Sequence, residues 1–320
     1  MTVPPLASSP AHGVRAGAVC VLYGSSVVPE IVAEFARTCP TVVVDNSGDL
    51  LDGGPDVRVV SPGRNVGYSA GVNAGLAALP AGLDAVLVVN PDIVGPVSAL
   101  HHLAEIVAGW DCPVLAAPEG GQLAYGFRPR AGALLVMGHY LARSDWHPTP
   151  RRPADRFLSG ALLAVNAGAL RVLAGDGEFL RPDLFFMDDV EITDRALAHG
   201  IAVVEVPVDG RLEHEGGTSM RRRPAVRIYF SRVSKVRYWQ RRSPVRGAAL
   251  RQFFRAETML GEFLARRRDH TRRHEPATDG SAAMGFAMAR QWLRTGAAGV
   301  DEAVLGNAND DASLTPRGDL

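Results

Sequence analysis

The first two thirds of the chain alternate between short, uninterrupted apolar runs and stretches with helical spacing. The apolar runs predict strands at 18–23, 41–44, 57–60 and 85–89, with helices at 30–37 and in a stretch that ends at residue 78. Strands that are apolar at every position, rather than at every second one, are typical of sheets that helices cover on both faces. The pattern therefore predicts an α/β fold built around a parallel sheet.

The chain becomes mainly helical after residue 214. Before that point we expect strands at 157–165 and 201–206 and helices at 167–173 and 188–199. After it we expect helices at 225–241, 246–268 and 282–293. The predicted organisation is a flexible N-terminus at 1–17, an α/β domain at 18–220, a C-terminal helical region at 221–300 and a disordered tail at 301–320.

Charged residues are distributed unevenly, although the formal net charge of the 320 residues is +0. Residues 1–210 carry 13 basic and 22 acidic side chains, residues 211–274 carry 18 and 5, and residues 275–320 carry 3 and 7. An acidic body is therefore followed by a basic segment, which forms the first part of the C-terminal helical region.

Cysteine usage and hydropathy predict the compartment. The three cysteines have no CxxC spacing, which fits a reducing environment and gives no zinc signal. No apolar run is long enough to span a bilayer, and the first residues do not have the pattern of a signal peptide. We therefore expect a cytoplasmic protein, with peripheral contact to the inner face of the membrane left open.

Polar or glycine-rich residues follow several of the expected strands. These strand ends carry Tyr23-Gly24, Asp45-Asn46, Arg64-Asn65 and Asn90-Pro91-Asp92. Ligands of parallel sheets bind at the carboxyl ends of the strands, so this pattern predicts a nucleotide pocket.

Each strand-end motif has a functional and a structural interpretation. Asp45 can accept a hydrogen bond from the imide of a pyrimidine base, or it can close an ordinary turn. The glycine-rich run at 65–75 can bring a helix N-terminus to a diphosphate, or it can allow tight packing of a helix on the sheet. Asp92 can hold a divalent cation, or it can cap the next helix.

Acidic residues cluster at Asp188-Asp189-Val190-Glu191, directly after an aromatic run. A single acid is enough to cap a helix and complement its macrodipole, so three acids in four residues indicate an additional role. Asp189 or Asp188 can act as a general base toward a hydroxyl group. His214, which precedes a glycine pair, can close on the same metal ion as Asp92.

Taken in order, these blocks resemble the family 2 glycosyltransferases with the GT-A fold, in particular the bacterial rhamnosyltransferase-type branch. The resemblance rests on five blocks in the family's order: 42–46, 65–75, 87–92, 157–161 and the stretch from 185 to 219. It implies a Rossmann-like mixed, mostly parallel sheet flanked by helices, followed by the C-terminal helical region.

The resemblance also implies roles for individual residues. Asp189, with Asp188 beside it, corresponds to the catalytic base, and Asp92 and His214 correspond to ligands of Mg²⁺ or Mn²⁺. The implied donor-nucleotide residues are Tyr23, Asp45, Arg64, Asn65, Gly67, Asn73 and Asn90. The implied acceptor-side residues are Ser159, Gly160, Glu191 and Arg195, of which Arg195 has a supporting role.

There are three departures from the family pattern. The first strand ends in Leu22-Tyr23-Gly24 where Thr-Tyr-Asn is usual. Asp188 stands where Glu is usual, and Glu191 stands where Asp is usual. In the metal motif, Asn90-Pro91-Asp92 has one carboxylate where the DxD form has two.

The implied activity is an inverting transfer of a sugar to a hydroxyl group. The best-matching donor is dTDP-L-rhamnose, and a UDP-hexose is next. The acceptor classes are a glycan, a lipid-linked glycan and a natural product. The sequence assigns no oligomeric state.

Two other functions compete with this interpretation. Residues 211–274 contain Arg221-Arg222-Arg223 and Arg266-Arg267-Arg268 together with aromatic residues, so they could bind nucleic acid or a membrane surface. No nucleic-acid-binding motif accompanies them, and a solvated charged face is the commonest interpretation of such a run. A sugar-nucleotide pyrophosphorylase would need a basic, glycine-rich loop after the first strand, which Gly24-Ser25-Ser26-Val27 does not provide.

Overall fold

A computed structural model describes most of the chain. The residues described are 13–50, 52–120, 125–127, 156–175, 177–214, 224–271, 282–296, 301 and 304–305. Most of the expected N-terminal segment and nearly all of the expected tail lie outside these ranges, as do Arg221-Arg222-Arg223 and the glycine pair after His214.

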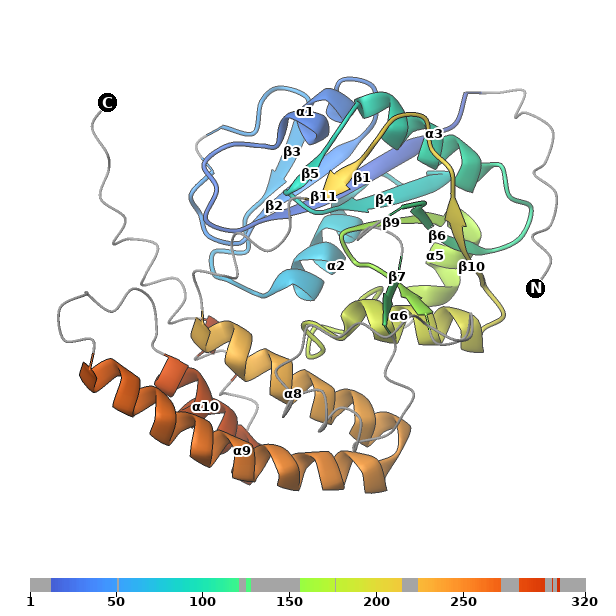
Figure 1. Ribbon diagram of the computed structural model, residues 1–320. Helices are drawn as coiled ribbons and strands as arrows, with labels where there is room; N and C mark the ends of the chain where they lie inside the picture. Colours follow the sequence, from blue (N-terminus) through green and yellow to red (C-terminus); the bar gives the residue numbers. More distant parts are fainter. Residues whose placement is uncertain are drawn as a thin grey trace, which may run out of the picture.

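A seven-stranded sheet forms the centre of the molecule (Figure 1). Its strands lie in the order β10-β6-β9-β4-β1-β2-β3. Their bounds are β1 Ala16–Leu22, β2 Thr41–Asp45, β3 Val57–Val60, β4 Ala85–Val89, β6 Val114–Pro118, β9 Leu162–Asn166 and β10 Ala202–Val206. All neighbours pair in parallel except β9, which is antiparallel to both β4 and β6.

Helices cover both faces of the sheet (Figure 1). One face carries α1 (Glu30–Ala36) and α3 (Val97–Ala108), and the other carries α2 (Tyr68–Ala78), α5 (Ala167–Leu173) and α6 (Asp188–Ala198). Each face has its own cluster of buried apolar side chains. The apolar strands thus lie between two cores, as their uninterrupted hydrophobicity predicted.

Two short pairings position loops at the edge of the sheet. Strand β5 (Ile93–Val94) pairs with β11 (Glu213–His214), and β7 (Tyr125–Phe127) pairs with β8 (Arg156–Leu158). The single strand expected at 157–165 is therefore wrong. The segment forms two strands, β8 and β9, separated by residues 159–161. Strand β8 pairs with β7, whereas β9 belongs to the main sheet.

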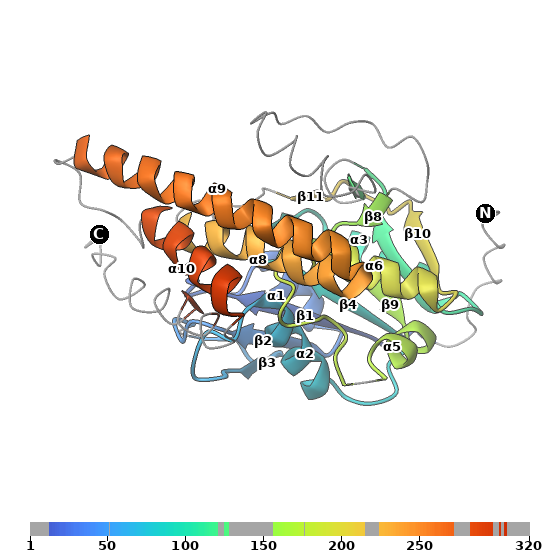
Figure 2. The ribbon, with the colours of Figure 1, turned by 90° about the horizontal axis from the view of Figure 1, so that it is seen from below.

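The C-terminal helices form a further layer beneath α2 and α6 (Figures 1 and 2). They are α8 (Pro224–Arg242), α9 (Pro244–Thr271) and α10 (Ala282–Thr295), and they pack on one another. A third apolar cluster joins them to Leu184, Met187 and Val190, immediately around the acidic motif. Val304, in the segment expected to be disordered, is buried in this cluster.

The predicted fold class is confirmed: a mixed, mostly parallel sheet is flanked by helices and followed by a helical region. Helix α3 and strand β6 were not among the predicted elements. Residues 16–17, expected in the flexible N-terminus, begin β1 and are buried. In the ranges described, no helix combines the length and the hydropathy needed to cross a membrane.

Candidate active site

The pairing of β5 with β11 brings the two predicted metal ligands together. His214 lies opposite Ile93 in the register, directly beside Asp92. The Nε2 atom of His214 is 3.1 Å from Oδ1 of Asp92, and both side chains are largely buried. Two residues separated by 122 positions in the sequence are therefore adjacent in space.

Asn90 supplies a further oxygen at the same strand end. Its Oδ1 atom is buried and has no hydrogen-bond partner among the described residues, while its backbone N–H donates to the carbonyl of Ala161 at 2.8 Å. A carboxylate and an amide oxygen are suitable ligands for Mg²⁺ or Mn²⁺. In the described part of the chain, no three His, Cys, Asp or Glu side chains are arranged so that they could hold a metal ion together, so an ion here would need oxygens from a bound diphosphate or water.

The acid pair Asp188 and Asp189 lies at the start of α6. Oδ2 of Asp188 accepts a hydrogen bond from Ser69 Oγ at 3.1 Å, and Oδ1 of Asp189 accepts one from the backbone of Val190 at 2.8 Å. Burial raises the pKa of both carboxyl groups. The negative charge of Asp188 raises the pKa of Asp189 further.

Tyr68 and Gly160 connect the acid pair with the strand ends. The Tyr68 hydroxyl donates to the carbonyl of Gly160 at 3.1 Å, and a Cβ on Gly160 would lie 3.4 Å from Cβ of Asp189. Burial raises the pKa of Tyr68, and the charges that add to this effect include Asp188, Asp189 and Asp92. The predicted base and the predicted metal ligand therefore lie within electrostatic reach of one tyrosine.

Asp45 closes the turn after β2, as its structural interpretation predicted. Oδ1 accepts from the backbones of Ser47 and Gly48 and from the Ser47 hydroxyl, and Oδ2 accepts from the backbone of Leu50. Oδ2 retains capacity for a further hydrogen bond. Contact with a base stays a prediction.

The glycine-rich run begins α2 and packs it tightly on the sheet. A Cβ on Gly75 would lie 2.4 Å from Val19, and one on Gly71 would lie 2.9 Å from Val21, so both positions exclude any side chain. Asn65 accepts from the backbone of Gly67, which has a φ of 83°. The tight-packing interpretation thus holds for the glycines inside the helix.

The remaining donor-side residues have different positions. Both ends of the Asn73 amide pair with the backbone of Leu180, which ties α2 to the loop before α6. Tyr23 is partly buried against the C-terminal helices, and Arg64 is exposed in the loop before α2. Their contacts with a nucleotide stay predictions.

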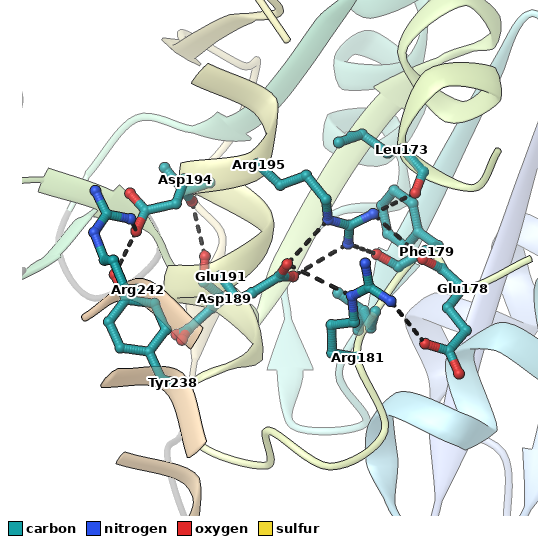
Figure 3. A network of polar contacts seen from close by, with 12 residues as sticks. Leu173, Glu178, Phe179, Arg181, Asp189, Glu191, Asp194, Arg195, Tyr238 and Arg242 are labelled. Atoms are coloured by element: carbon teal, nitrogen blue, oxygen red, sulfur yellow. Dashed lines mark hydrogen bonds and ion pairs between the residues drawn. The ribbon is translucent and has the colours of Figure 1, made fainter. Parts of the chain in front are cut away.

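Glu191 and Arg195 form an ion pair that holds the loop between α5 and α6 (Figure 3). Arg195 donates to the carbonyls of Leu173 and Phe179, and Glu191 also lies 3.7 Å from Arg181. Arg195 thus holds the loop in place, and its supporting role in the reaction stays a prediction. Of the other acceptor-side residues, Ser159 lies beside Gly160 and accepts from the backbone of Ala161.

Many arginines of the basic segment are paired with acids of the body. Arg237 and Arg241 contact Asp183, and Arg242 contacts Asp194. The nucleic-acid alternative also involved four aromatic residues of this segment, and these are buried in the helical cluster: Tyr229, Phe230, Tyr238 and Trp239. These four aromatic side chains are therefore not available to stack on the bases of a nucleic acid.

A scan of the chain against models of known protein families gives no match. The N-acetylglucosaminyl-diphospho-decaprenol L-rhamnosyltransferase of Mycobacterium tuberculosis, from strains CDC 1551 and H37Rv, is 28% identical over 192 residues. The chain is similar to a bacterial rhamnosyltransferase. This similarity confirms the resemblance predicted from the motifs. The match covers 52% of this chain and spans 62% of the length of the curated relatives.

Among solved structures, the mannosyltransferase PcManGT from Pyrobaculum calidifontis, in complex with GDP-Man and Mn²⁺, covers 98% of this chain and 79% of its own. Its sequence identity is 15% and its TM-score is 0.45.

Three residues of the site were not predicted individually. Tyr68 and Ser69 lie within the run that we analysed for its glycines, and they contact the Gly160 loop and the acid pair. Asn46 is buried after β2, donates to Gly67 and has an Oδ1 atom without a partner in the described ranges. A hydroxyl or amide next to a strand end is the only sequence signal for such residues.

The Arg195 contacts generate a stability prediction. Arg195→Met keeps much of the side-chain volume but leaves two carbonyls and the partly buried Glu191 without their main donor, so we expect the free energy of unfolding to fall by roughly 3 kcal/mol. Urea denaturation measures this change. Arg171→Met, at an exposed arginine of α5, is the matched control and should be nearly neutral. Equal stability of the two variants would show that the ion pair contributes nothing.

Proposed function

We propose that the protein is an inverting glycosyltransferase that uses a nucleotide-sugar donor. The observation that carries the proposal is the convergence of the Asp188–Asp189 pair and the Asp92–His214 pair around Tyr68 and the Gly160 loop. The sequence similarity to a rhamnosyltransferase supports the same activity.

In the proposed reaction, the Asp189 carboxylate takes the proton of the acceptor hydroxyl. The acceptor oxygen attacks the anomeric carbon from the face opposite the diphosphate, and the bond from that carbon to the diphosphate breaks with its electron pair leaving on the nucleotide. The raised pKa of Asp189 suits this role, because a base is most effective when its pKa lies near the working pH.

Asp188 has a different part in the proposal. Its carboxylate is held by Ser69 and lies inside the protein, so its charge acts on Asp189 rather than on solvent. We expect it to keep the pKa of Asp189 high and to fix the start of α6, which makes it a positioning residue.

Asp92, with His214 and the free oxygen of Asn90, is the proposed place for Mg²⁺ or Mn²⁺. A divalent ion held there would stabilise the negative charge that develops on the leaving diphosphate. The residues of this strand end would orient the donor with its anomeric carbon toward Asp189.

For the donor we propose L-rhamnose from dTDP-L-rhamnose, with a UDP-hexose next. For the acceptor we propose a lipid-linked glycan, presented at the cytoplasmic face of a membrane. The similarity to an N-acetylglucosaminyl-diphospho-decaprenol L-rhamnosyltransferase supports rhamnose as the sugar and a lipid-linked acceptor.

Donor binding can be tested by thermal shift with dTDP-, UDP- and GDP-sugars, each with and without Mn²⁺. A donor at 100 times its dissociation constant adds about 2.7 kcal/mol of stability, so Tm should rise by several degrees. We expect dTDP-rhamnose with Mn²⁺ to give the largest rise and Asp92→Asn to lose the Mn²⁺-dependent part. Asp209→Asn, at an exposed acid, is the control. A flat response to every donor would exclude the proposed function.

The base assignment predicts that Asp189→Asn lowers kcat by about 10²–10⁴-fold, because the amide cannot accept the acceptor's proton. Donor binding, measured by the same thermal shift, should be unchanged. Asp194→Asn, on the same helix but paired with α8, keeps its kcat if the effect is specific. Full turnover by Asp189→Asn would assign the base to another residue.

The raised pKa of Asp189 predicts the pH dependence. The base works only when deprotonated, so kcat/KM should fall as the pH decreases through a pKa well above the ordinary aspartate value of about 3.9. Asp188→Asn removes a neighbouring negative charge and should move this acidic limb to lower pH. Glu105→Gln, which removes an exposed charge from α3, should leave the acidic limb in place. Identical pH profiles for the unchanged chain and both variants would show that the charge of Asp188 does not affect Asp189.

A further inference from the structure

The outward face of α9 is unusually apolar for an exposed helix. The side chains of Met259, Leu260, Phe263 and Leu264 are exposed by 60%, 60%, 52% and 44%. Their spacing places them on one side of the helix. Figure 2 shows α9 crossing the front of the molecule, outside α8 and α10. A solvated helix carries polar residues at such positions.

Two acidic residues of the same helix, Glu257 and Glu262, do not belong to this exposed face. Glu262 is buried and pairs with Arg266 and Arg290, and Glu257 pairs with Arg232 of α8. In the part of α9 whose side chains are described, every exposed charged residue is an arginine, namely Arg246, Arg255, Arg266 and Arg267. The exposed face is therefore both apolar and cationic.

Arg267 illustrates how the two characters combine. Its guanidinium lies over the ring of Phe263, 4.5 Å from the ring centroid. The aliphatic part of such an arginine lies along an apolar surface, while its guanidinium group stays in contact with polar surroundings. This arrangement suits a boundary between hydrocarbon and anionic groups.

We propose that this α9 face docks on an anionic lipid surface, with the four apolar side chains entering the headgroup region and the arginines contacting lipid phosphates. Charge complementarity selects this occupant. In a symmetric pair of chains the same patch faces itself, which would bring arginines against arginines. Nucleic acid offers no partner for Met259, Leu260 and Leu264, and the ring of Phe263 is already covered by Arg267.

Docking would also position the candidate active site. Phe185, three residues before Asp188, packs against Phe230 of α8 with ring centroids 5.2 Å apart, so the helical layer and the acid pair share one apolar cluster. If the proposed function holds, this layer sets the distance of Asp189 from the bilayer that carries the acceptor. The docking itself does not depend on that activity.

Vesicle co-sedimentation of the full chain tests the proposal without donor or acceptor. We expect binding to phosphatidylcholine vesicles that contain phosphatidylglycerol, weak binding to phosphatidylcholine alone, and weakening by added salt. Met259→Glu/Phe263→Glu and Arg255→Glu/Arg267→Glu should each weaken binding roughly tenfold or more. Val172→Glu and Leu197→Glu, which change exposed apolar residues on α5 and α6, serve as matched controls and should bind like the unchanged chain.

Three results would overturn the proposal. The first is no binding to anionic vesicles by the unchanged chain. The second is equal binding by the α9 variants and the controls. The third is the absence of vesicle binding together with evidence of another occupant. If the unchanged chain is a dimer and the α9 variants are monomers, a second copy covers the face. If the α9 variants have a lower Tm, the chain itself covers it. An assay of sugar transfer to a soluble acceptor separates membrane docking from the proposed function. The α9 variants should keep this transfer activity even if they no longer bind vesicles.

Discussion

Two carboxylates side by side at the first turn of α6, one buried and one half-buried, impose the central constraint on this structure. Burial and mutual repulsion both oppose their ionisation, so their surroundings must supply compensation. Ser69 donates to Asp188, the backbone of Val190 donates to Asp189, and the positive end of the helix dipole lies at the same place. The tight packing of α2 on β1, which the glycines at 71 and 75 permit, is what brings Ser69 within reach.

The sequence predicted the parts of this arrangement that depend on local pattern. Uninterrupted apolar runs identified the strands, and polar residues after them identified Asn90, Asp92 and the neighbouring strand ends. Contacts made by distant segments carry no local signal. The approach of His214 to Asp92 depends on the pairing of β11 with β5, and the division of the 157–165 strand depends on where β9 joins the main sheet. Hydrophobic periodicity cannot reveal either event.

Several arginines of the basic segment are paired within the chain. Arg237 and Arg241 contact Asp183, Arg242 contacts Asp194, and Arg232 contacts Glu257. The acidic body and the basic helices are thus attached to each other through ion pairs as well as through an apolar cluster. Part of the charge difference between the two regions therefore lies at an internal interface.

The arginines on the outward face of α9 take no part in the ion pairs that join α8 to the acidic body. On this helix the usual distribution is reversed, because Glu262 is inside while Met259, Leu260 and Phe263 are outside. Water does not stabilise such an arrangement, since exposed apolar area lowers stability and solubility. A medium that is apolar within and negatively charged at its edge stabilises both components at once. That is the environment that the helix itself specifies, and it is where a lipid-linked acceptor would be found.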